Sequence, residues 1–61
     1  MKAFLEISMD SAAFEDNMAS ELARILRHLA ERIEDLGVME SKLRDINGNT
    51  VGSFVIVEGE K

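Results

Sequence analysis

The sequence predicts an α+β fold of order β-α-β-β, in which one helix packs on a three-stranded, mostly antiparallel sheet. Three patterns predict it: alternation over residues 3–9, apolar spacings of three and four over 18–36, and an Asn-Gly pair between two further alternating runs. The chain has 61 residues, a length that predicts one small domain over 1–61. We expect residues 58–61 to form a frayed tail.

The first strand is predicted from alternation. Ala3, Leu5, Ile7 and Met9 alternate with Phe4, Glu6 and Ser8, which is typical of a strand with one buried face. Asp10 and Ser11 then supply residues that favour a chain turn and a helix cap.

The helix is predicted over residues 18–36. Its apolar side chains fall within an arc of about 80°, with Ile25 at the edge. They are Met18, Leu22, Ile25, Leu26, Leu29, Ile33 and Leu36. Asn17 or Asp16 suits the N-cap, and Gly37 suits a left-handed C-cap. The residues leave open whether the helix begins near 18 or near 11.

The last two strands are predicted as a hairpin around Asn47-Gly48, which favours a two-residue type I′ turn. In that register Arg44 faces Val51, and one buried face is formed by the pairs Leu43 with Gly52, Ser41 with Phe54, and Met39 with Ile56. The order of the three strands in the sheet stays open.

One helix covers only one face of such a sheet, and we expect it to pack on Leu5, Ile7, Met39, Leu43, Phe54 and Ile56. The uncovered apolar residues predict a self-association face and a homodimer. They are Phe4, Ile46, Val51, Val55 and Val57. The alternative is a marginal monomer whose second face is solvated.

The residues predict no enzyme, cofactor or metal site. The chain has no Cys and a single His, and no set of nucleophile, base and acid is recognisable. His28 is best explained as a solvated or interface residue. Asp10, Glu15 and Asp16 could bind Mg²⁺ or Ca²⁺, but capping and the helix dipole explain them more simply.

Charge weighs against two classes of partner. A net charge of −5 disfavours general nucleic-acid binding and anionic membranes. With no apolar run of about 20 residues and no signal peptide, we expect a cytoplasmic protein. Two alternatives stay open. A dimer could bind nucleic acid through Arg24, Arg27, Arg32, Lys42 and Arg44, or the chain could act as an acidic decoy through Glu6, Asp10, Glu15, Asp16 and Glu21.

Two segments carry a family resemblance. They are residues 11–17 (SAAFEDN) leading into 21–27 (ELARILR), and residues 43–52 (LRDINGNTVG). Together they resemble small uncharacterised proteins encoded by bacteriophages, prophages and plasmids, over about residues 3–52. The resemblance implies a mobile-element origin inside bacteria and brings no functional residues with it. The leading hypothesis is a non-enzymatic homodimer that binds a host or phage protein.

Overall fold

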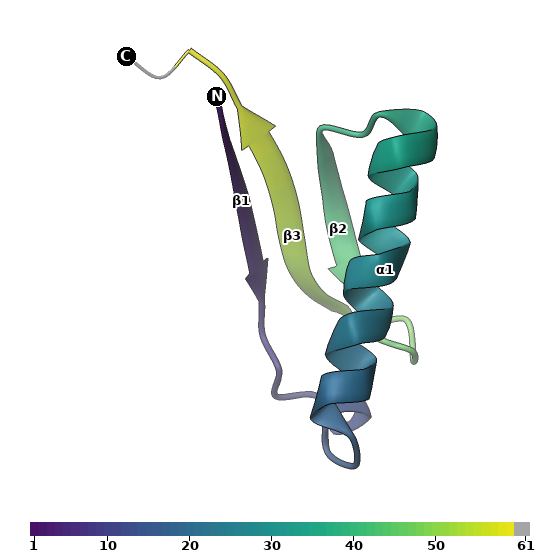
Figure 1. Ribbon diagram of the computed structural model, residues 1–61. Helices are drawn as coiled ribbons and strands as arrows, with labels where there is room; N and C mark the ends of the chain where they lie inside the picture. The colour runs from purple at the N-terminus through teal and green to yellow at the C-terminus, as the bar shows by residue number, and fades with distance from the viewer. Residues whose placement is uncertain (60–61) are drawn as a thin grey trace.

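The computed structural model describes residues 1–59 and confirms the α+β fold (Figure 1). Its elements are strand β1 (Lys2–Ile7), the short 3₁₀ helix η1 (Ala12–Phe14), helix α1 (Met18–Leu36), and strands β2 (Glu40–Arg44) and β3 (Thr50–Val57). The sheet has the order β1-β3-β2 and both pairings are antiparallel. The last strand is therefore central, while β1 and β2 form the two edges.

Helix α1 begins and ends where its capping residues predict. The side chain of Asn17 accepts a hydrogen bond from the Ser20 N–H at 3.1 Å, which satisfies one of the free donors of the first turn. Gly37 adopts the left-handed conformation with φ 66°, and its N–H donates to the Ile33 carbonyl at 2.9 Å. The helix therefore starts at 18, and η1 is a separate turn in front of it.

Strand β1 is shorter than its alternation predicts. It ends at Ile7, although the Ser8 N–H still donates to the Val51 carbonyl at 2.7 Å. Met9, predicted as a strand residue, instead packs against the core beyond the strand end. The chain turns away here because η1 must carry Phe14, which is also buried, back to the helix.

The hairpin register is confirmed over its outer part, but the predicted two-residue turn is wrong. Leu43 pairs with Gly52 and Ser41 with Phe54, as expected. The loop has three residues between Asp45 and Asn49, because the Asp45 N–H donates to the Asn49 carbonyl and the Gly48 N–H to the Asp45 carbonyl, at 2.9 and 3.0 Å. Among the described residues only glycines have positive φ, so the type I′ turn, which needs it at both central residues, does not form.

A bulge follows from this longer loop. Arg44 pairs with Thr50 rather than with Val51, which leaves Val51 as the extra residue. Such a residue can turn its side chain differently from the strand alternation, and Val51 packs against the core. Its predicted place on the uncovered face is therefore wrong.

Gly52 is required by the contact between β1 and β3. A Cβ atom on Gly52 would overlap the Glu6 carbonyl oxygen and lie 2.9 Å from the Ile7 Cα. Any side chain would therefore push the edge strand away from the central one. This is a packing role that the hairpin pattern alone does not reveal.

The core is small and lies near the helix–β2 side. It consists of Phe14, Ile25, Leu29, Leu43 and Phe54. The helix packs mainly along β2 and η1 and not over β1, and Figure 1 shows it beside β2 with β1 at the far edge of the sheet. Two residues predicted to lie under the helix are consequently uncovered: Leu5 is 45% exposed and Met39 is 48% exposed.

Candidate interaction surfaces of helix α1 and the sheet

An apolar surface remains open on the helix side of the sheet. We call it the open apolar surface; its members are all exposed to solvent. They are Leu5, Leu26, Ile33, Leu36 and Met39. Only five hydrophobic residues are buried in the described chain, so this surface is as large in residue number as the core itself.

The reason lies in how the helix is rotated. Its buried residues are Glu21, Ile25 and Leu29, whereas the centre of its apolar stripe lies further round, between Leu29 and Ile33. At 100° per residue the two directions differ by about 50°. The sheet therefore buries one margin of the stripe. Since Arg24, His28 and Arg32 lie beside the outer edge of β2, the other margin, with Leu26 and Ile33, is directed over the β3–β1 side.

The overall dimensions agree with an incompletely buried chain. The radius of gyration is 12.5 Å, whereas a compact domain of this length has a radius of about 10.5 Å. The accessible surface is 4532 Å², against about 3,950 Å² for a monomeric protein of this mass. The excess of about 580 Å² is smaller than the area of about 800 Å² that each partner buries in a standard interface.

The predicted self-association face is assembled only in part. Phe4 pairs across the strands with Val55, and Val57 lies two pairs further along, opposite Lys2. Phe4 and Val57 are exposed. Ile46 lies instead in the hairpin loop, where it is 67% exposed, and Val51 packs against the core. What remains is a narrow apolar strip on the far face of the sheet.

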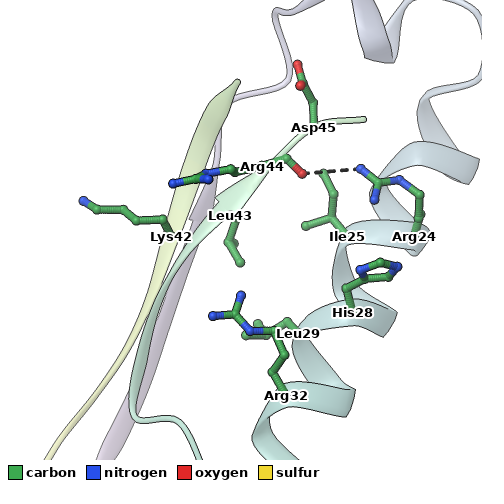
Figure 2. Close-up of a pocket in the computed structure, with 9 residues that line it drawn as sticks. All are labelled: Arg24, Ile25, His28, Leu29, Arg32, Lys42, Leu43, Arg44 and Asp45. Atoms are coloured by element: carbon green, nitrogen blue, oxygen red, sulfur yellow. Dashed lines mark hydrogen bonds between the residues drawn. The ribbon is translucent and has the colours of Figure 1, made fainter. Parts of the chain in front are cut away.

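Four of the five predicted basic residues line one pocket, here called the β2-edge pocket, two of them by their main chain only. It has a volume of about 420 Å³ between α1 and β2, and its lining includes Arg24, His28, Arg32, Lys42 and Arg44. Arg27, the fifth predicted basic residue, is exposed and does not line it. Figure 2 shows that Lys42 and Arg44 point away from the helix, so these two residues line the pocket with their main chain.

Glu21 connects the helix to the hairpin loop. Its carboxylate accepts from Arg24 Nε and Nη2 at 3.0 and 2.9 Å, and from the Ile46 N–H at 2.9 Å. Hydrogen bonding to Arg24 holds the pKa of Glu21 below its ordinary value. Burial of the carboxylate raises this pKa, and the hydrogen bond from the Ile46 N–H lowers it further. Sequence reasoning placed Glu21 among the acids of a possible decoy surface and did not find its contact with Ile46, because the two residues lie 25 positions apart.

Asp45 organises the loop itself. Its carboxylate accepts from the N–H groups of Asn47 and Asn49, both at 2.9 Å, and from Asn49 Nδ2 at 3.2 Å. Burial raises the pKa of Asp45, but the hydrogen bond from the Asn49 N–H and the others outweigh burial, and the pKa is lowered. An Asp that bonds the main chain two residues on is a common turn device.

Two of the acids predicted for a decoy surface are already engaged. Glu21 is buried and paired with Arg24, and Asp10 accepts from the Ser8 hydroxyl at 3.3 Å. Within residues 1–59, no group of three or more His, Cys, Asp or Glu side chains is placed to hold a metal ion. No helix in that range is long and apolar enough to cross a membrane.

Comparisons with known proteins identify no relative of this chain. No protein-family model matches the chain, and no curated protein or solved structure matches it significantly.

Proposed function

We propose that the protein is a non-enzymatic interaction module that works as a homodimer in the bacterial cytoplasm, where it binds a host or phage protein. The observation that carries the proposal is the open apolar surface. Leu26 and Ile33 are 39% and 37% exposed on a helix whose other margin is buried. In a monomer these apolar side chains stay in contact with water, which is unfavourable in free energy. Packing against a second copy would bury them and remove that unfavourable contact.

The surface suits a second copy of the same chain. Its members bear no charge, and the helix margin beyond Leu26 continues with Ala19, Ala23 and Ala30. Small residues let two helices approach closely, so two α1 helices related by a two-fold axis could bury both open surfaces together. This changes the face expected from the sequence: the dimer uses the helix side of the sheet. The strip with Phe4, Val55 and Val57 is left for the other protein.

Light scattering after size-exclusion chromatography, at tens of micromolar, tests the proposal. The wild-type chain should elute with twice the chain mass. The double variant Leu26→Glu, Ile33→Glu should elute as a folded monomer, because two buried charges would oppose association. The matched control is Phe4→Glu, on the other face, which should remain dimeric. A strictly monomeric wild type, or a dimer lost only in the Phe4 variant, would contradict the proposed dimer.

The nucleic-acid alternative draws on one observation, the gathering of Arg24 and Arg32 at the β2-edge pocket. Arg27 is not part of that group, and the Lys42 and Arg44 side chains leave on the other side of β2 (Figure 2). A phosphate backbone would therefore meet a divided set of cations. A salt-dependent mobility shift of DNA or RNA that is abolished by Arg32→Glu would support this alternative over a protein partner.

A further inference from the structure

The outer edge of β2 is open for pairing. The Ile56 N–H donates to the Met39 carbonyl at 2.8 Å, so every second residue of β2 bonds to β3. Ser41 and Leu43 share that phase, and the main-chain groups of Glu40 and Lys42 point outward, where the Lys42 carbonyl accepts from the exchangeable Ser41 hydroxyl at 3.1 Å. The Arg44 carbonyl also points outward, because it accepts from Arg24 Nη2 at 3.4 Å. An edge of this kind accepts an added strand.

The helix places two arginines and a histidine beside this edge. Arg24, His28 and Arg32 follow one another at intervals of four residues and line the β2-edge pocket (Figure 2). Arg24 is held by Glu21 and closes the end of the pocket near Arg44. His28 and Arg32 are exposed and stand beside the part of the edge that remains open.

The spacing of these side chains matches an extended peptide. Four residues of helix rise by about 6 Å, and two residues of strand advance by about 6.8 Å. Side chains at alternate positions of a strand added to β2 would therefore stay in step with His28 and Arg32. A carboxylate at the position beside Arg32 would meet its guanidinium, which can donate two hydrogen bonds to the two oxygens of one carboxylate.

The pocket favours acidic side chains although the whole chain is acidic. Arg24 is paired with Glu21, and the side chains of Lys42 and Arg44 point away from the helix. Arg32 is therefore the Lys or Arg side chain of the lining that stays available to a ligand, with His28 beside it. The one acid in its described lining, Asp45, is bonded to the N–H groups of Asn47 and Asn49, and Figure 2 shows its carboxylate turned out of the pocket. An acidic ligand thus meets no unpaired carboxylate of the lining there.

We propose that the β2-edge pocket binds an extended acidic peptide, which pairs with β2 as a fourth strand and directs alternate carboxylates toward His28 and Arg32. A peptide fits better than a nucleic acid because the open main-chain groups of β2 are partners for a peptide main chain. The site lies on the flank of α1 away from the open apolar surface, so it does not depend on the proposed dimer.

Fluorescence anisotropy with a labelled seven-residue peptide that alternates Glu with Val tests the site. The wild-type chain should bind it, and Arg32→Glu should weaken binding by about tenfold. The matched control is Arg27→Glu, which makes the same charge change on the same helix outside the pocket and should weaken binding less than twofold. Circular dichroism confirms that both variants fold. Equal losses in the two variants would show attraction by overall charge only and would overturn the proposal.

Two further probes test the strand pairing. A peptide methylated at the main-chain nitrogens that face β2 should lose binding, and the amide NMR signals of Glu40 and Lys42 should shift with the unmodified peptide. A methylated peptide that binds as well as the unmodified one would rule out an added strand. No binding at millimolar peptide, together with an oligonucleotide that binds through Arg32, would assign the pocket to nucleic acid instead.

Discussion

The two flanks of α1 differ in the kind of group that is left exposed beside them. The flank with Leu26 and Ile33 exposes apolar surface that no part of the described chain covers. The flank with His28 and Arg32 lies beside a strand edge whose main-chain groups lack a neighbouring strand. Both follow from the position of the helix along β2 rather than over the middle of the sheet. The position of the helix therefore leaves an apolar surface on one flank and the polar main-chain edge of β2 beside the other.

The largest expected effect is a difference in folding stability between a substitution on the buried margin of the helix and one on its open flank. Leu29→Ala should destabilise the fold by about 3 kcal/mol, because it leaves a cavity in a core of five residues. Leu26→Ala should cost the monomer less than about 1 kcal/mol, since this side chain is already partly in water. Urea unfolding measures both. Similar losses in the two variants, measured in the monomer, would mean that Leu26 is packed and that the flanks are not different.

Gly52→Ala should have the next largest effect, about 2 kcal/mol, because the added methyl group overlaps the β1 main chain. The loss should act mainly on β1, which carries Leu5 of the open apolar surface, and leave the β2-edge pocket in place. Hydrogen exchange of the β1 and β2 amides measures this. Equal loss of protection in both edge strands would show that the sheet responds as one unit.

Asn17→Ala should cost about 1 kcal/mol by leaving the Ser20 N–H without its partner. Because the cap lies at the helix start and belongs to neither flank, dimer affinity and peptide affinity should both be unchanged. Thermal unfolding and the two binding assays test this together. A selective loss of either affinity would show that one flank depends on the first helical turn.

The smallest effect should be a pH dependence confined to the polar side. Glu21 and Asp45 have lowered pKa values, so their contribution to stability is complete above their ordinary values of 4.5 and 3.8 and is lost as pH falls through the lowered ones. Glu21→Gln should make the unfolding midpoint less sensitive to pH below 4.5. An unchanged slope would mean that the Glu21–Arg24 pair contributes nothing to this dependence.

Local patterns sufficed for the helix and much of the sheet. The end of the helix follows from Gly37, and the outer hairpin register follows from alternation around the turn. The start of the helix, which the sequence left open between 18 and 11, is decided by the Asn17 cap. The turn type was missed because the side chain of Asp45 competes with the Asn-Gly preference through its bonds to Asn47 and Asn49. Helical spacing predicts which apolar residues share a face of α1, but it does not predict which of them the sheet covers.

The sequence by itself determined the elements, their order and the surplus of apolar side chains, since these depend on neighbours within a few residues. Only the tertiary structure decided that β3 is central, that α1 lies along β2, and that Glu21 reaches the hairpin loop. Those outcomes depend on contacts between distant residues, in which the close approach required at Gly52 and the bulge at Val51 set the geometry. A rotation of the helix by about 50° decides whether the sheet covers Leu26 or leaves it exposed.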